Sequence, residues 1–135
     1  MDRKKSKVKY YRDLQVWQKG IELVKEIYLL TKQFPKEEIY GLSSQIRRAS
    51  VSIPSNIAEG QARKNTDEFR QFLYIALGSL AEVDTQLELP IQLSYLSQND
   101  IHKTANLVLE LRKMLYSLIN KLPKKKSWLI LITKH

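Results

Sequence analysis

Four stretches of the chain repeat apolar residues at alternating intervals of three and four positions, the spacing of one face of an α-helix. We call each set of apolar positions a stripe. The stripes predict helices over about residues 13–33, 41–63, 66–89 and 100–122. Because only short connections remain, the four apolar faces must bury one another. We therefore expect an all-α fold, an antiparallel up-down four-helix bundle with crossing angles near about 20°.

The stripes are, in chain order, Leu14, Trp17, Ile21, Val24, Tyr28 and Thr31, widened by Leu23, Ile27, Leu30 and Phe34; Leu42, Ile46, Ala49, Ile53 and Ile57; Phe69, Leu73, Ala76, Leu80, Val83 and Leu87; and Thr104, Val108, Leu111, Leu115, Leu118 and Leu122. Good N-cap residues precede three of them: Asp13, Asn65 with Glu68, and Asn99 or Asp100. Prolines follow the first and the fourth, at Pro35 and Pro123. Pro90 interrupts the third helix, which either kinks there or ends near Leu89.

Pro54 lies inside the second stripe without disturbing its phase. If Pro54 began a new helix, Ile53 would be its N-cap, and isoleucine is among the poorest residues at that position. The sequence therefore predicts one continuous, kinked helix, in which the proline ring displaces the carbonyl of Ser50.

The same helix has a second apolar face opposite the stripe, formed by Val51, Ala58 and Ala62. One bundle core cannot use both faces of a helix. Two explanations remain open: an exposed alanine-rich face, or a surface for self-association. We favour self-association.

Positive charge is concentrated at the two ends of the chain. The net charge is +5 over residues 1–12 and +5 over residues 121–135, whereas residues 13–120 carry −1. We divide the 135 residues into a basic N-terminal arm (1–12), one four-helix bundle (13–122) and a basic and apolar tail (123–135). The tail contains SWLILI, the only stretch of the chain that resembles a strand.

Basic side chains around the second helix and in the two ends are candidate nucleic-acid contacts. They are Arg47, Arg48, Arg63, Lys64, Arg70, Lys4, Lys5, Lys124, Lys125 and Lys126. Charged ends that merely keep the protein soluble would have the same composition. Since most aromatic residues fall on core positions, with Tyr10 and Tyr11 as exceptions, we expect backbone-driven and weakly selective binding.

The sequence offers little for catalysis. Its two histidines, His102 and His135, lie far apart, and no phosphate loop, nucleophile elbow or paired Glu-x-x-His motif occurs. We expect no enzyme, no cofactor and no metal site. With no cysteine, no apolar run of bilayer length and no secretory signal, the expected location is the cytoplasm, with no membrane partner.

Three segments carry a resemblance to a known family: YRDLQVWQKG (11–20), FPKEEIYGLSSQIRRASVSIPSNIAEGQAR (34–63) and FLYIALGSLAE (72–82). They resemble the bacterial four-helix-bundle proteins encoded by intervening sequences of 23S ribosomal RNA genes, and SIPSNIAEG is the most specific part. The resemblance implies a ring-like homopentamer of up-down bundles. A more distant likeness to accessory subunits of diversity-generating retroelements implies a basic pentamer that engages a reverse transcriptase and nucleic acid.

Two hypotheses for function follow. The first is a non-catalytic, oligomeric bundle that binds nucleic acid, RNA or a ribonucleoprotein, through its basic residues. The second is a protein-binding adaptor or structural oligomer in which the arginines form interface ion pairs.

Overall fold

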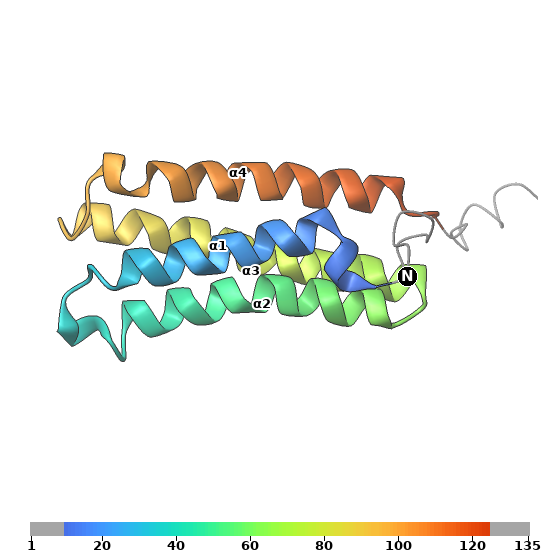
Figure 1. The fold of residues 1–135 in the computed structure, drawn as a ribbon, viewed down its shortest axis with the longest axis horizontal. Helices are drawn as coiled ribbons and strands as arrows, with labels where there is room; N and C mark the ends of the chain where they lie inside the picture. The colour runs from blue at the N-terminus through green and yellow to red at the C-terminus, as the bar shows by residue number, and fades with distance from the viewer. Residues whose placement is uncertain (1–9, 125–135) are drawn as a thin grey trace, which may run out of the picture.

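A computed structural model describes residues 10–124 of the chain. It contains α1 (Gln15–Thr31), α2 (Leu42–Ala62), α3 (Thr66–Gln92) and α4 (Gln98–Lys121), with short 3-10 turns η2 (Tyr11–Asp13) and η3 (Lys36–Glu38). Figure 1 shows consecutive helices running in opposite directions along one long axis. The predicted all-α four-helix bundle is confirmed. The strand-like stretch 127–132 lies outside the described residues.

The helices follow one another around the bundle in chain order. α1 contacts α2 and α4, and α3 contacts the same two neighbours. Two ion pairs set the register of α1 against α4: Lys19 with Glu110 at 3.3 Å and Glu26 with Lys103 at 3.0 Å. Lys19 precedes Glu26 on α1, whereas its partner Glu110 follows Lys103 on α4. These two helices are therefore antiparallel.

The core is built from all four helices. The second stripe is buried throughout, and the third and fourth stripes are buried at their central positions. The largest fully buried side chains of the core are Leu23, Ile27, Ile46, Ile53, Ile57, Leu73, Leu80, Val83, Thr104, Val108, Leu111 and Leu115.

The predicted core face of α1 needs correction. Ile21 and Tyr28, both in the first stripe, keep 43% and 39% of their surface exposed. The core is filled instead by Val16 and by the flanking positions Leu23, Ile27 and Leu30. α1 carries more apolar residues than one core can accept, so part of its predicted stripe is displaced to the surface.

α2 is one unbroken helix through Pro54, as predicted. The proline ring is buried and lies against α1, where a Cβ built on Gly20 would be 3.4 Å from the Pro54 Cβ. Near the proline, the Ser52 hydroxyl donates to the Ala49 carbonyl at 2.8 Å, and the Asn56 amide donates to the Ser52 carbonyl at 2.7 Å. The proline therefore serves as an interior packing residue, with side chains bonding the nearby backbone.

Glu38 takes over the capping of α2, because the N-cap residue Gly41 has no side chain to offer. The Leu42 amide donates to Glu38 Oε1 at 3.1 Å, and the Tyr95 hydroxyl donates to Glu38 Oε2 at 2.7 Å. These two hydrogen bonds, that of Tyr95 first, lower the pKa of Glu38. One carboxylate thus joins the α1–α2 connection to the turn before α4.

Two of the predicted helix starts differ from the structure. α4 is capped by Ser97 and not by Asn99 or Asp100: the Asp100 amide donates to Ser97 Oγ, and the Ser97 amide donates to Asp100 Oδ2. Asp100 instead completes a capping box, because the stabilising Ser and acidic residue stand three positions apart. Asp13 belongs to η2, and α1 follows Leu14 without a side-chain cap.

α3 behaves as predicted at its start and resolves the alternative at its end. Asn65 caps it by accepting from the Glu68 amide at 3.1 Å. The helix continues through Pro90 to Gln92, so it does not end near Leu89. Pro90 is buried at the last turn.

α2 and α3 approach each other closely at Gly60. A Cβ built there would lie 2.5 Å from Phe72 Cβ and 3.0 Å from Phe69 Cδ1, well inside van der Waals contact. Gly78, in the middle of α3, has no such neighbour within 4 Å. Of these two glycines, only Gly60 is required by packing.

We expect Gly60→Ala to destabilise the protein by about 1–3 kcal/mol, the cost of overpacking a well-filled core. The control Gly78→Ala should stabilise it by roughly 0.5–1 kcal/mol, since alanine is the better helix former at an exposed position. Urea unfolding followed by circular dichroism measures both. Equal stabilities of the two variants would contradict this packing.

Candidate nucleic-acid interface

The described chain enters and leaves the bundle at the same end. Tyr10, the α2–α3 turn and Lys124 all lie there (Figure 1). Arg70 ties this end together, because its guanidinium donates to the Pro123 carbonyl at 2.7 Å and to the Leu122 carbonyl at 3.5 Å. We call this region the basic end. Its described cations are Arg12, Arg63, Lys64, Arg70, Lys113, Lys121 and Lys124.

The structure divides the predicted cations into two groups. Arg63, Lys64, Arg70 and Lys124 lie at the basic end. Arg47 and Arg48 lie on α2 at least fourteen residues before its last residue, Ala62, which at about 1.5 Å per residue places them roughly 21 Å or more from that end of the helix. The structure therefore does not bring these predicted contacts onto one surface. Lys4, Lys5, Lys125 and Lys126 lie outside the described residues.

Arg47 is occupied within the bundle. Its Nε donates to Thr31 Oγ1 at 2.8 Å, and its guanidinium lies 4.6 Å from the centre of the Tyr28 ring. It joins the start of α2 to the end of α1. Arg48 is exposed and makes no hydrogen bond or ion pair with residues 10–124.

The two arginines of the basic end are also engaged. Arg63 pairs with Glu59 at 3.2 Å and lies 5.2 Å from the Phe72 ring centre, while Arg70 pairs with Asp67 at 3.0 Å. The lysines differ: Lys64, Lys113, Lys121 and Lys124 are exposed and have no ion pair within the described part of the chain. These lysines are the cations best able to exchange their counterions for phosphates.

Arg12 lies within a small aromatic cluster that sequence reasoning did not assemble. Its Nε donates to the Tyr10 hydroxyl at 3.0 Å, and its guanidinium lies 5.8 Å from the Tyr11 ring centre and 5.2 Å from that of Trp17. Hydrogen bonds to Tyr10 and then Tyr11 raise the pKa of Arg12. The signal was the spacing YYRDLQVW, in which η2 brings three rings beside one arginine.

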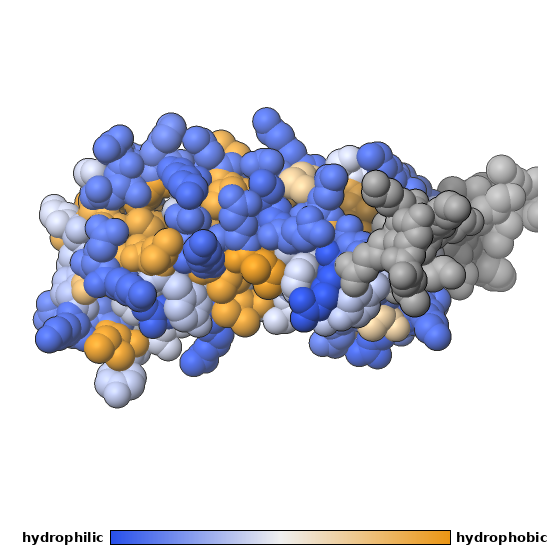
Figure 2. All heavy atoms as spheres, in the orientation of Figure 1, coloured by the Kyte–Doolittle hydropathy of each residue, from blue (hydrophilic) through white to orange (hydrophobic). Residues whose placement is uncertain are grey.

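A second exposed feature covers α1 and α2. Val51 and Ala58 lie three residues before and four residues after Pro54, so they flank the line along which α2 packs on α1. Ile21 follows Gly20 in α1, and Tyr28 faces α2 through its contact with Arg47. Figure 2 shows hydrophobic side chains gathered over the middle of α1 and α2. We call Ile21, Tyr28, Val51, Ala58 and Ala62 the association face.

Comparison with known families gives a match over residues 12–117 to the 23S rRNA-intervening sequence proteins. The chain belongs to this family. A similar solved structure is a protein of unknown function from the S23 ribosomal protein family of Bacteroides thetaiotaomicron. It shares 28% sequence identity and a TM-score of 0.70, and the alignment covers 78% of this chain and 99% of that one. A search of curated proteins gave no match.

The described residues contain neither a membrane-spanning helix nor a cluster suited to a metal ion. No helix among residues 10–124 has the length and apolar character that crossing a bilayer requires. Over the same residues, no group of three or more histidine, cysteine or acidic side chains lies in a position to hold a metal ion.

Lys64 adopts a left-handed backbone conformation, with φ at 59°. It directly follows Arg63, the C-cap of α2, at the position where glycine is usually found. Ser94, in the turn after α3 at the opposite end of the bundle, has the same conformation, with φ at 61°. A residue other than glycine at positive φ lowers the stability of the fold. Lys64 has this cost, but it places a cation at the basic end.

We expect Lys64→Gly to stabilise the protein by roughly 1 kcal/mol, because glycine adopts positive φ without steric cost. Ser94→Gly should stabilise it by a similar amount. If the basic end binds nucleic acid, only Lys64→Gly should also weaken that binding. Thermal unfolding and filter binding of both variants make the comparison, and equal loss of binding by the two would remove Lys64 from the interface.

Proposed function

We propose that this protein is a non-catalytic, oligomeric bundle that binds nucleic acid, with RNA or a ribonucleoprotein as its partner. The observation that carries the proposal is the gathering of Lys64, Lys113, Lys121 and Lys124 at the end of the bundle where the described residues begin and stop. In the sequence, the basic residues 1–9 and 125–135 adjoin this end. Acidic residues occur at this end too, but Glu59 and Asp67 are paired with Arg63 and Arg70. The four lysines have no ion pair within residues 10–124. The basic end is therefore the natural place for an anionic polymer to bind.

Binding at this end would depend mainly on phosphates. The exposed lysines form no rigid fork for base edges, and they lie on three different segments of the fold. The Tyr10–Tyr11–Trp17 cluster beside Arg12 offers stacking surface for an unpaired base. We therefore expect moderate affinity, little sequence selectivity, and a preference for single-stranded regions.

Oligomerisation would strengthen such binding. On the single chain, the association face leaves Ile21, Tyr28 and Val51 with 43%, 39% and 40% of their surface exposed. A ring of identical subunits, such as the homopentamer implied by the family resemblance, would repeat each basic end several times. Weak contacts per subunit then combine through their high effective concentration.

The second candidate function is a protein-binding adaptor, and the partner could be a nucleic-acid enzyme. It is favoured by the connection between α1 and α2, where Tyr40 is 97% exposed and Ile39 is 55% exposed. Neighbouring exposed apolar side chains of this kind are common at protein interfaces. This connection lies at the end of the bundle opposite the basic end, so the two functions use separate surfaces.

We predict that the full chain retains labelled RNA on a filter, and that the logarithm of its affinity falls linearly with the logarithm of salt. The slope should be about −0.7 per neutralised phosphate for a single strand. Replacing Lys64, Lys121 and Lys124 by Gln should weaken binding and make this slope shallower by roughly two units, because three phosphate contacts are lost.

A matched control replaces three exposed cations of the opposite end, Lys32, Lys36 and Arg48, by Gln. This variant has the same net charge as the first and should bind as the unaltered chain does. Equal weakening by both variants would show that only net charge matters. If the unaltered chain ignores RNA and DNA at roughly 50 mM salt, where phosphate contacts are least screened, the adaptor function replaces the nucleic-acid function.

We predict an oligomer in solution, most simply five copies of the 15.8 kDa chain. Val51→Lys should shift it toward smaller species, because it places a charge in the association face. The control is Ile75→Lys on α3, a residue that is 51% exposed and lies outside that face. Light scattering after gel filtration measures both masses. A monomer of unaltered chain at micromolar concentration would contradict oligomerisation.

A further inference from the structure

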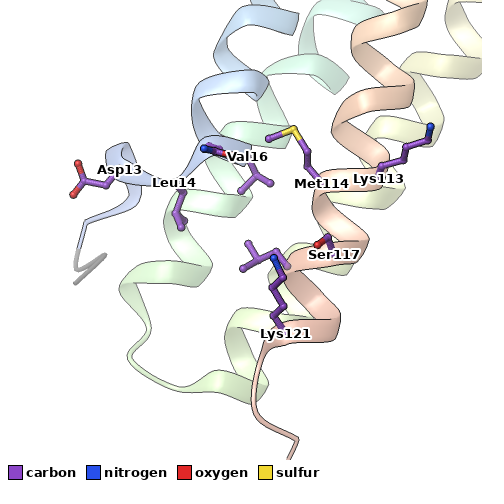
Figure 3. Close-up of a pocket in the computed structure, with 9 residues that line it drawn as sticks. Asp13, Leu14, Val16, Lys113, Met114, Ser117 and Lys121 are labelled. Atoms are coloured by element: carbon purple, nitrogen blue, oxygen red, sulfur yellow. The ribbon is translucent and has the colours of Figure 1, made fainter. Parts of the chain in front are cut away.

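Three hollows join into one track at the basic end. The largest, a groove of about 580 Å³, lies between the start of α1 and the end of α4 (Figure 3). A second hollow of about 400 Å³ shares Leu14 and Leu118 with it and extends across the end of the bundle to Phe69. A third shares Asn65 and Thr66 with the second and reaches Pro123 and Lys124. We call the first two together the end groove.

The end groove has an apolar floor, and its rim carries Lys64, Lys113 and Lys121 together with the acidic Asp13. Val16 is buried, while Leu14, Phe69, Met114 and Leu118 are only partly buried and pack against the core from its end. Figure 3 shows Val16 on α1 and Met114 on α4 at the two sides of the groove, with Lys113, Ser117 and Lys121 along α4. An apolar floor of this kind gains stability when an apolar segment covers it.

The chain itself supplies a segment of the right kind and place. Residues 128–132 (WLILI) are the longest apolar run outside the four helices, and they follow Lys124 after only three residues. At no more than about 3.3–3.6 Å per residue, Trp128 can lie up to roughly 14 Å from Lys124. The track from Lys124 past Asn65 and Thr66 leads into the end groove. We propose that residues 128–132 dock in the end groove of their own bundle.

The N-terminal arm is the poorer occupant, although it also begins at this end. Residues 1–9 (MDRKKSKVK) carry five basic side chains and only Met1 and Val8 as apolar ones. It has no run of apolar side chains that could cover the apolar floor. Docking of the C-terminal segment instead holds Lys124, Lys125 and Lys126 beside Lys64 and Lys121, whether or not the protein binds nucleic acid.

A single-cysteine label tests the docking. The chain has no cysteine, so Ser117→Cys places one bimane fluorophore in the groove. Tryptophan quenches bimane only near contact, and Trp128 belongs to the proposed occupant. A tethered segment has an effective concentration of about millimolar, so we expect Trp128→Phe to raise the fluorescence roughly two-fold or more. Because Trp17 is present in both proteins, the difference reports Trp128 alone.

Three control proteins define the outcome. Ile130→Asp with Leu131→Asp keeps Trp128 but should relieve quenching equally, without touching the bundle. A label at Asn99→Cys, at the opposite end, should not respond to Trp128→Phe. Removing residues 1–9 should leave the quenching intact. No change on Trp128→Phe would overturn the proposal. So would quenching seen only when labelled Trp128→Phe chains are mixed with unlabelled chains that retain Trp128, since the segment would then dock on a second copy.

Discussion

The contact of Gly60 with Phe69 and Phe72 is the constraint on which the rest of the bundle depends. With no side chain at residue 60, the backbone of α2 lies directly on two aromatic rings of α3. The chain then reverses within three residues: Arg63 is the C-cap of α2, Lys64 is left-handed, and Asn65 is the N-cap of α3. This fixed hairpin presents the buried stripes of α2 and α3 to α1 and α4 in one register. The same contact decides where the α2–α3 turn meets the chain ends.

That geometry sorts the cations by their role. Arg47, Arg63 and Arg70 make contacts within the fold. Arg47 donates to the Thr31 hydroxyl, Arg63 pairs with the Glu59 carboxylate, and Arg70 donates to the Pro123 carbonyl. The exposed lysines of the basic end form no ion pair within the described residues. A formal charge of +9 therefore does not locate an interface, whereas the exposure of Lys64, Lys121 and Lys124 supports the proposed one.

Much of the fold could be predicted because its signals are local. The phase of the second stripe across Pro54, the poor capping of Ile53 and the Asn65 cap each depend on residues within one or two turns. α1 was harder, because it has two apolar faces and only its neighbours decide that Leu23 is buried while Ile21 is exposed. The candidate site was only half predictable: sequence marks a residue as basic, but whether Arg47 is free depends on Tyr28 and Thr31, which lie sixteen or more residues away.

The central claim is that the basic end, and not the charge of the whole chain, meets the nucleic acid. Backbone amide spectra of isotopically labelled protein, titrated with a short single-stranded RNA, test it most directly. The account predicts shifts at residues 10–17, 60–70 and 113–124, while residues 31–48 and 88–104 at the opposite end stay unchanged. Shifts centred on Arg47 and Arg48, or spread evenly over the helices, would contradict it.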